Sequence, residues 1–507
     1  MGDSGLGEPR AEGMGRAWAA DDADAMNIAI IGAGAAAVGL LDALDPALVE
    51  TVTVFDPAPL PWRGRPYRPD LASVLVNAPP EIMSIRAGDR DHYAGWLDEN
   101  VPGAYLDERL GRPVPPRAVY GEYLAETAET ALARFPAARL VQEAVTGISL
   151  GERPVVETAG ARYTADQVVL CVGGGTPRDL YGLTGVPGFV ADPYPLEQTL
   201  ATIPSGQDVI VLGSGLTAVD IVVSLAARGH TGRISLASRS GALPYVWQRP
   251  VETEIKHLTA DRLRGPVTLG TLSDLIRREL AEHHEDWDDL AAAIAMPPDP
   301  VTALREQLAL VDAPLRGRRI LQETAHTLGP AVWRLLPEPD RRRLREDHFR
   351  TITGLASPMI PGNAAVLLEL LDAGALELLS GMTGIEAGFR LGHATGTRAA
   401  DVVINAVNPP PHAIPQRAEP LVTSLLAQGA SRHLDGGLTV DTGHLVVAGR
   451  ADPRLHVVGD LAGGGPFITS GIAGVAAQAH RTARSIQDRS GDESPDRSRM
   501  SVALRDA

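Results

Sequence analysis

Two stretches of the chain, residues 27–56 and 207–240, repeat one pattern. Each begins with an apolar run of strand length, passes through a turn of the form Gly-x-Gly-x-x-Ala, continues with helical spacing and ends in a second apolar run. The turns begin at Gly32 and Gly213. A strand, a glycine turn and a helix in this order predict a helix N-terminus that can bind a phosphate group. The repeat therefore predicts an α/β chain with two Rossmann-like dinucleotide-binding domains.

Each position of the first turn has a physical task. Gly32 permits the tight turn, Gly34 lets the backbone approach a pyrophosphate, and the small Ala37 lets the helix pack closely on the strand. Asp56 ends the second strand, 24 residues after Gly32, where a carboxylate can accept hydrogen bonds from ribose hydroxyls. We expect these residues to form the stronger of the two dinucleotide sites.

The apolar residues of the first stretch could instead belong to a membrane span or a signal peptide. Only 14 uncharged residues lie between Asn27 and Asp42, fewer than the roughly 20 that span a bilayer. The residues just before them are acidic, whereas a signal peptide begins with a positive region. We therefore expect a cytoplasmic protein with no membrane partner, a disordered leader over residues 1–25 and a disordered tail over residues 487–507.

The second stretch ends differently from the first. Its second strand ends in Ser-Arg-Ser, where the first ends in an acid. A carboxylate there would repel the 2′-phosphate of NADPH, whereas arginine and serine hydroxyls can bind it. The candidate NADP-binding residues are Gly213, Gly215, Ala218, Ser238, Arg239 and Ser240. The alternative for Arg239 is a surface arginine at a strand end.

Charge and cysteine content exclude several classes of protein. A formal charge of −17 argues against a nucleic-acid partner, because phosphate neutralisation needs clustered cations. Cys171 is the only cysteine, so the chain cannot form a disulfide framework, a dithiol or a thiolate zinc site, and we expect this thiol to be buried as a small apolar group. The adjacent His283 and His284 would point in different directions from a helix, and we expect no metal site.

The C-terminal part resembles the closing segment of flavoproteins that bind two dinucleotides. In those proteins a Gly-Asp pair at a strand end, here Gly459 and Asp460, meets the ribityl chain and diphosphate of FAD. The next helix is expected to begin near Ser470, and its N-terminus would stabilise negative charge on a reduced flavin. The resemblance therefore implies FAD in the first domain and NADPH in the second.

The order of motifs is similar to the bacterial FAD/NAD(P)-binding family that neighbours the flavin-dependent N-hydroxylating monooxygenases, the ornithine and lysine hydroxylases. Besides the two glycine turns, residues 76–97, with Asn-x-Pro and Met-Ser elements, and residues 113–126 carry the resemblance. It implies that Asn77 and Met83 lie beside the flavin ring. The candidate FAD-binding residues are then Gly32, Gly34, Ala37, Asp56, Asn77, Met83, Val145, Gly459, Asp460, Ser470, Gly471 and Ile472.

The chain departs from this family at two places. Many relatives carry a stretch rich in His and Arg after the segment that corresponds to residues 332–343, and here residues 344–364 keep little of it. Relatives often close with an acidic segment that contains tryptophan, where this chain has a glycine-rich one. The resemblance therefore does not name the substrate.

Long helical spacing between the second glycine turn and the C-terminal segment predicts a helical cap, about residues 248–350. We expect FAD-binding residues over 26–200, an NADP-binding domain with its cap over 201–350, and a second FAD-binding part over 351–486. Residues 401–410 would be the strand that returns to the flavin. From position alone, the candidate substrate contacts are Asn363, Asn408 and His348.

These features predict an FAD-dependent, NADPH-consuming oxidoreductase. The family resemblance implies a monooxygenase that uses molecular oxygen to N-hydroxylate a small polar amine or amino-acid-like metabolite. No side-chain nucleophile or acid–base pair is singled out as catalytic, and flavin chemistry needs none. One alternative is a reductase or amine dehydrogenase that does not use oxygen. Another is a non-catalytic flavin-binding protein, which the intact glycines of both turns disfavour. The sequence indicates no oligomeric state.

Overall fold

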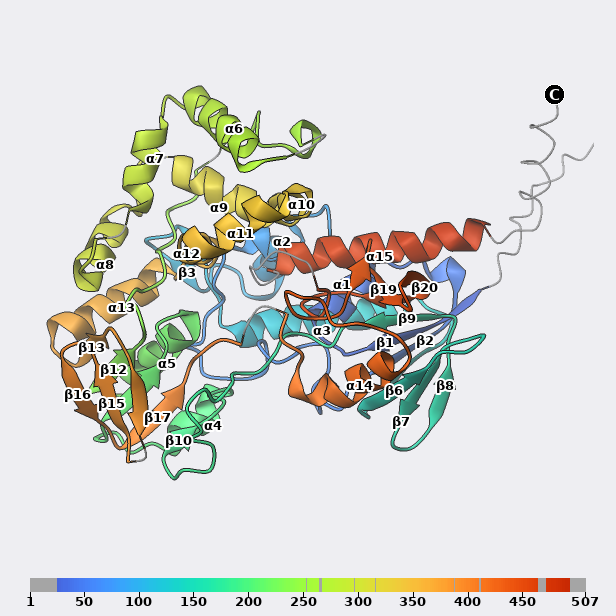
Figure 1. The fold of residues 1–507 in the computed structure, drawn as a ribbon, viewed down its shortest axis with the longest axis horizontal. Coiled ribbons are helices and arrows are strands. Elements are labelled where there is room, and N and C mark those ends of the chain that lie inside the picture. Colours follow the sequence, from blue (N-terminus) through green and yellow to red (C-terminus); the bar gives the residue numbers. More distant parts are fainter. Residues whose placement is uncertain are drawn as a thin grey trace, which may run out of the picture.

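The computed structural model describes residues 25–492, except 252, 264–266, 296, 315, 387, 410–411 and 464–470. Two α/β units lie next to each other, and a helical cap lies above their junction (Figure 1). The first unit is built on a sheet of seven strands and the second on a sheet of five. The predicted α/β class with two Rossmann-like domains and a helical cap is confirmed.

The first unit is formed by two separated parts of the chain. Its N-terminal elements are β1 (Met26–Ile31), α1 (Ala35–Ala43), η1 (Pro46–Leu48), β2 (Val49–Phe55), η2 (Pro80–Ile82), α2 (His92–Asn100), β3 (Leu106–Asp107), β4 (Arg112–Pro113), α3 (Arg117–Leu132), β5 (Ala138–Val141), β6 (Val145–Ser149), β7 (Val155–Thr158), β8 (Arg162–Thr164) and β9 (Gln167–Leu170). Its C-terminal elements are η4 (Gln416–Ala418), α14 (Glu419–Ala427), β18 (Val440–Asp441), β19 (His444–Val447), β20 (Arg450–Val457) and α15 (Ile472–Asp492).

The order of the first sheet is β18-β19-β20-β9-β1-β2-β5. β1 pairs in parallel with β2 and β9, and its last four residues are buried, as expected for a strand with helices or sheets on both faces. Helices α1, α3 and α15 cover one face, and the small sheet β6-β7-β8 with α14 covers the other. This arrangement places the first glycine turn at the carboxyl end of β1.

The second unit has the same design. Its elements are β10 (Phe189–Val190), α4 (Leu196–Ala201), β11 (Val209–Leu212), α5 (Leu216–Ala227), β12 (Ile234–Ala237), α13 (Pro361–Asp372), β13 (Leu376–Leu379), β14 (Gly384–Glu386), β15 (Arg390–His393), β16 (Gly396–Ala399) and β17 (Val402–Asn405). The order of its sheet is β10-β17-β11-β12-β13, and every pair is parallel. The second glycine turn follows β11, the central strand.

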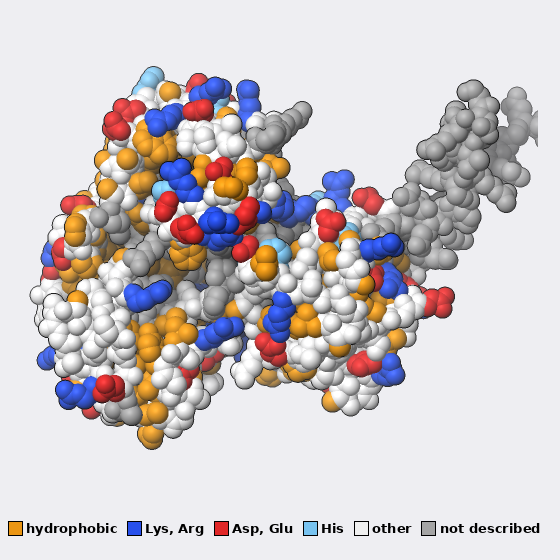
Figure 2. All heavy atoms as spheres, in the orientation of Figure 1, with side chains coloured by type: hydrophobic (Ala, Val, Ile, Leu, Met, Phe, Trp, Pro, Cys, Tyr) orange, Lys and Arg blue, Asp and Glu red, His pale blue; other side chains and the backbone are white. Residues whose placement is uncertain are grey.

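The cap is helical, as predicted. Its elements are η3 (Ala260–Arg262), α6 (Leu269–Glu282), α7 (Trp287–Ile294), α8 (Pro300–Ala309), α9 (Gly317–Thr327), α10 (Gly329–Leu335), α11 (Glu338–Asp347) and α12 (Phe349–Ala356). Side chains of Thr268, Asp286 and Asp299 cap the first three α-helices by accepting backbone N–H groups. Figure 2 shows acidic and basic side chains gathered over α11, none of whose described residues is buried. Its charge run is a solvated helix face.

Three expected boundaries differ from the structure. β17 was expected to return to the first unit, but it lies between β10 and β11 and pairs with both, so residues 351–405 belong to the cap and the second unit. β10 joins the second sheet before residue 201. α15 continues to Asp492, beyond the expected start of the tail at Gln487. Residues 1–24 of the expected leader lie outside the described residues.

α15 is an amphipathic helix of 21 residues. Its alanines Ala476, Ala479 and Ala483 are buried, because small side chains let it pack closely on α1. None of the helices in the described part of the chain is long and apolar enough to span a bilayer.

Candidate functional site

The first glycine turn packs closely against the ends of the neighbouring strands β2 and β9. Gly32 has φ +101° and donates its N–H to the carbonyl of Phe55 at 2.8 Å. A Cβ at Gly32 would lie 2.3 Å from the carbonyl oxygen of Cys171, so only glycine fits. Gly34 is the N-cap of α1 and offers no capping side chain. The first N–H groups of α1 are thus not capped by a side chain at that position.

Asp56 lies at the end of β2 and holds the turn. Its Oδ2 accepts the N–H of Ala33 at 2.8 Å, and its Oδ1 accepts the N–H of Ala58 at 2.8 Å. The side chain is 6% exposed and lines a cavity. Each carboxylate oxygen can accept more than one hydrogen bond, so these two bonds leave room for a ribose hydroxyl. The expected ribose contact itself remains a prediction.

This cavity, which we call the turn cavity, has a volume of about 290 Å³. Six other predicted FAD-binding residues also line it, namely Gly32, Gly34, Val145, Gly459, Asp460 and Ile472. A Cβ at Gly174 would lie 2.7 Å from Oδ2 of Asp460, so the loop after β9 must be free of side chains there. Ala37 is fully buried in α1, where its methyl group packs rather than lines the cavity.

The sequence analysis missed one side of the turn cavity. Residues 63–67 cross in front of the first turn, and the Cα of Gly64 lies 3.6 Å from the position of a Cβ on Gly34. Arg63, Arg65 and Arg417 add three cations to the lining. The available signal in the sequence was Gly64 between two arginines, but the segment around it has neither strand nor helix periodicity.

A second cavity of about 250 Å³ adjoins the first and shares Pro66, Tyr67 and Ile472 with it. We call it the Asn77 cavity. Asn77, Met83, Gly471 and Ile472 all line it, as the resemblance implied for the ring of a flavin. Ser470 lies outside the described residues.

Hydrogen bonds fix the walls of the Asn77 cavity. The backbone carbonyl of Asn77 accepts Nε1 of Trp247 at 2.6 Å, and that of Met83 accepts the hydroxyl of Tyr120 at 2.8 Å. Among the described residues that line this cavity, none is a histidine, cysteine or carboxylic acid. Ala356 and Ser357 reach it from the end of α12, within the segment that departs from the family pattern.

A buried ion pair joins the two units beside this cavity. Nη2 of Arg117, on α3, lies 2.6 Å from Oδ2 of Asp220, on α5, and both side chains are nearly inaccessible. Nη2 also reaches Oδ1 of Asn77 at 3.4 Å, and the Tyr194 hydroxyl donates to Asp220 at 2.5 Å. Burial lowers the pKa of Arg117, but the charge of Asp220 together with Tyr194 and Tyr67 more than offsets this and raises the pKa above its usual value.

The second glycine turn reproduces the first. Gly213 has φ +116° and donates its N–H to the carbonyl of Ala237 at 2.8 Å, and a Cβ there would lie 2.8 Å from the carbonyl oxygen of Ala406. Gly215 is the N-cap of α5 and again provides no side-chain cap. Leu216, the first residue of α5, lines the Asn77 cavity. The second turn therefore lies at the edge of the cavity that extends from the first.

The other predicted NADP-binding residues divide into two groups. Ala218 is fully buried in α5, and the hydroxyl of Ser238 accepts the N–H of Gly241 at 2.9 Å. Arg239 and Ser240 are exposed after the end of β12. Their contact with a 2′-phosphate remains a prediction.

The largest of these cavities, about 640 Å³, lies between the cap and the first unit. We call it the cap cavity. It shares Ile82, Trp247 and Ala473 with the Asn77 cavity. Its walls come from the loop of residues 79–90, the segment after β12, α9 and α15.

The three candidate substrate residues are not brought together. Asn363 is buried in α13, His348 is exposed between α11 and α12, and Asn408 lies beside the second turn, with Oδ1 3.5 Å from the Thr217 hydroxyl. None of them lines the Asn77 cavity or the cap cavity. Their contact with a substrate therefore stays a prediction, and side chains from distant segments build the cap cavity instead.

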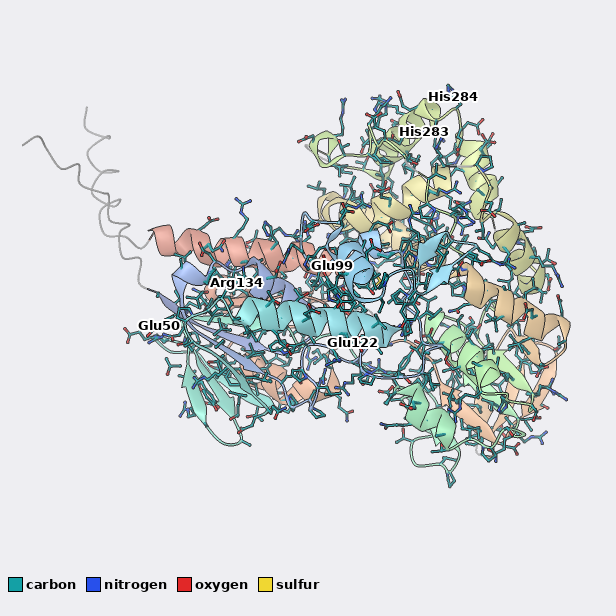
Figure 3. The ribbon with its side chains drawn as sticks, turned by 180° about the vertical axis from the view of Figure 1, so that it is seen from behind. Glu50, Glu99, Glu122, Arg134, His283 and His284 are labelled. Carbon is teal, nitrogen blue, oxygen red and sulfur yellow. The ribbon has the colours of Figure 1, made fainter. Side chains whose placement is uncertain are left out.

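Cys171 lines the turn cavity, whereas the histidine pair lies in the cap, with Nε2 of His283 3.7 Å from Glu279. Cys171 is buried, as predicted, and burial raises the pKa of its thiol. Figure 3 shows His283 and His284 at the outer part of the cap, away from α1 and α3. Within the described part of the chain, no three His, Cys, Asp or Glu side chains are placed to hold a metal ion.

Comparison with known proteins identifies the first unit and the fold. Residues 29–175 match a family model described as FAD-NAD(P)-binding, so the N-terminal part of the chain is an FAD/NAD(P)-binding domain. No curated protein matches the chain. The predicted relation to a bacterial FAD/NAD(P)-binding family is confirmed for this domain.

Several solved structures share the fold along most of the chain. An L-lysine 6-monooxygenase from Pseudomonas syringae is 16% identical, with a TM-score of 0.55 over 92% of this chain and 99% of that one. An ornithine hydroxylase from Pseudomonas aeruginosa, in its reduced form, is 14% identical with a TM-score of 0.54 and the same coverage. An ornithine N-hydroxylase from Kutzneria sp. 744, solved with reduced FAD, NADP⁺ and L-ornithine, is 15% identical with a TM-score of 0.52 over 92% and 99%. At these identities the likeness establishes the fold.

Proposed function

We propose that the protein is an FAD-dependent, NADPH-consuming monooxygenase that N-hydroxylates a small polar amine or amino-acid-like metabolite. The observation that carries this proposal is the convergence of both glycine turns on one continuous space. The first turn lines the turn cavity, which adjoins the Asn77 cavity, and Leu216 next to the second turn lines that same cavity. Two dinucleotides bound at these turns would therefore bring their reactive rings together.

The residues present fit FAD in the first unit. The glycine turn leaves the N-terminus of α1 without a side-chain cap, and α1 can stabilise a pyrophosphate by its aligned N–H groups. Asp56 would bind ribose, Gly459 and Asp460 would face the diphosphate and ribityl chain, and the Asn77 cavity would take the ring. NADPH would bind to Gly213 and Gly215, with Arg239 at its 2′-phosphate.

When bound and reduced, FAD supplies electrons for the activation of oxygen. The protein's own part is to shape and dry the site. No acidic side chain among the described residues lines the Asn77 cavity, which limits unwanted proton delivery, and Trp247 with Ala356 and Ser357 supplies part of its wall. The structural neighbours include proteins named for the hydroxylation of lysine and ornithine and the monooxygenation of cadaverine, which supports an amine substrate.

Isotope labelling tests the proposal. FAD-loaded protein would be given NADPH, ¹⁸O₂ and candidate amines, and the product would be analysed by mass spectrometry. We expect a product that gains one labelled oxygen atom while NADPH consumption follows product formation. Turnover that proceeds equally well without oxygen would establish a reductase or dehydrogenase instead. Retention of flavin without consumption of NADPH or turnover of any amine would favour the non-catalytic flavin-binding alternative.

A further inference from the structure

The cap cavity contains two buried polar groups that have no hydrogen-bond partner in the described part of the chain. Oε1 of Gln248 and Nε2 of Gln322 have no hydrogen-bond partner, both residues line the cavity, and both are 2% exposed. An unsatisfied buried polar atom costs about 1–3 kcal/mol, so such atoms in a cavity wall indicate a ligand or water that pairs with them.

The assignment of Gln248 as an acceptor is fixed by its other bond. Its Nε2 donates to the backbone carbonyl of Leu310 at 2.9 Å. A carbonyl oxygen only accepts hydrogen bonds, so the amide cannot be turned the other way, and its oxygen must be the free atom. Gln248 therefore requires a donor from the ligand, whereas the Gln322 amide, in the orientation of the structure, presents its free Nε2 to an acceptor.

The charges of the cavity wall favour an anion. Among the described residues, four arginines line it, Arg86, Arg90, Arg112 and Arg319, and two glutamates do. Both glutamates are occupied by arginines of the same wall: Glu81 lies 2.7 Å from Arg112, and Glu323 lies 3.2 Å from Arg90. A third arginine, Arg86, lies 2.9 Å from Asp42 behind the wall. Among the described residues of the wall, guanidinium groups thus outnumber carboxylates, and a ligand ammonium would find no carboxylate without an arginine partner.

The donor that Gln248 requires is therefore better supplied by a neutral N–H than by an ammonium group. A secondary amide has one N–H donor and one carbonyl acceptor, which match Oε1 of Gln248 and Nε2 of Gln322. A carboxylate would be held by the arginines, as is common for planar anions.

We propose that the cap cavity binds a ligand that carries both a carboxylate and a neutral amide, such as an N-acylated amino acid, with the amide held between Gln248 and Gln322. This deepens the proposed function and rests on it for one point only, the orientation of the ligand's free amine towards the Asn77 cavity. The shared residues Ile82, Trp247 and Ala473 show that the two cavities adjoin.

Calorimetric titration of the oxidised, FAD-loaded protein tests this proposal with four probes. L-lysine has a carboxylate and Nα-acetyl-L-lysine adds the amide, whereas cadaverine and N-acetylcadaverine lack the carboxylate. We expect Nα-acetyl-L-lysine to bind at least tenfold more tightly than each of the other three. Equal or tighter binding of L-lysine, or no measurable binding of Nα-acetyl-L-lysine, would overturn the proposal.

Variants assign the preference to the two glutamines. Gln248→Leu and Gln322→Leu should remove most of the preference for Nα-acetyl-L-lysine over L-lysine, and a preserved preference in both would contradict the proposal. Because Nε2 of Gln322 is unsatisfied, Gln322→Leu should also leave the urea midpoint of the ligand-free protein unchanged or raise it. Gln307→Leu is the matched control: Gln307 is equally buried in the cap but bonds Arg318 and does not line the cavity. It should lower the midpoint and keep the preference.

Binding and oxygenation can fail separately. If Nα-acetyl-L-lysine binds in a glutamine-dependent manner but gains no labelled oxygen, the ligand class stands and the monooxygenase proposal falls. If an amine without an amide is oxygenated and bound more tightly, the function stands and the ligand class is wrong.

Discussion

The two glycines of the first turn should fail for different reasons when each is replaced by alanine. Gly32→Ala introduces a Cβ 2.3 Å from the carbonyl oxygen of Cys171, at φ +101°. Gly34→Ala introduces a Cβ whose nearest neighbour is the Cα of Gly64 at 3.6 Å, at φ −111°. The first substitution therefore conflicts with the protein itself, whereas the second conflicts only with a ligand that approaches the turn.

The magnitudes follow from these contacts. At Gly32, a positive φ costs a residue with a side chain about 1–3 kcal/mol, and displacing the backbone of Cys171 adds about 1–3 kcal/mol. At Gly34, the loss of chain entropy in the unfolded state stabilises alanine by about 0.4–1 kcal/mol, while alanine is a poorer N-cap by a similar amount. The free energy of unfolding should thus fall by about 2–6 kcal/mol in Gly32→Ala and change by less than about 1 kcal/mol in Gly34→Ala.

Two measurements separate the variants. The urea midpoint of the flavin-free protein, followed by circular dichroism, should fall clearly for Gly32→Ala and stay near wild type for Gly34→Ala. The dissociation constant of FAD, measured by flavin fluorescence, should rise at least tenfold for Gly34→Ala, which is a loss of about 1.4 kcal/mol. Normal FAD affinity in Gly34→Ala would refute the pyrophosphate assignment, and an unchanged midpoint in Gly32→Ala would refute the steric argument.

Three further predictions concern other parts of the molecule. Arg239→Ala should raise KM for NADPH about 10- to 150-fold, the equivalent of about 1.5–3 kcal/mol for one charge-assisted contact, and leave KM for NADH nearly unchanged; equal loss with both nucleotides would place Arg239 elsewhere. Asp220→Ala leaves Arg117 buried without its counter-charge and should lower the free energy of unfolding by about 3–5 kcal/mol in urea titrations, and a loss below about 1 kcal/mol would contradict this account of the pair. Burial and then the charge of Arg86 lower the pKa of His92, so the unfolded chain binds this proton first as pH falls below about 6.5, and stability decreases on acidification. The decrease in urea midpoint from pH 7 to pH 5 should be smaller in His92→Gln, and an equal decrease would exclude His92 as its source.

Local sequence patterns predicted the glycine turns because the backbone conformation at those positions accepts no residue other than glycine. The positive φ and close carbonyl contact of Gly32 recur at Gly213. Because such positions accept only glycine, they appear in the sequence as glycines at a fixed spacing. The buried strands were also predictable as strands, since both faces are covered.

The partner of each strand was not predictable in the same way. β17 begins with three apolar residues, and this pattern fits a central position in either sheet, so its assignment to the first unit was wrong. The wall of the cap cavity combines Gln248, Gln322 and Arg86 from segments far apart in the chain. Neither glutamine belongs to a sequence motif. Each was singled out because its buried amide has an atom without a hydrogen-bond partner, and this can be recognised only from the packing of the folded chain.

The position of β20 next to β9 also affects how the protein is made. On the ribosome, β9 is complete at Leu170, but its partner residues Leu455–Val457 appear only after the whole second unit and cap. At about 5–20 residues per second, the apolar edge of β9 waits roughly 15–60 seconds for its neighbour. An unpaired edge of four buried residues is a template for pairing with other chains. Chaperone demand during synthesis should therefore be concentrated on the N-terminal third of the chain.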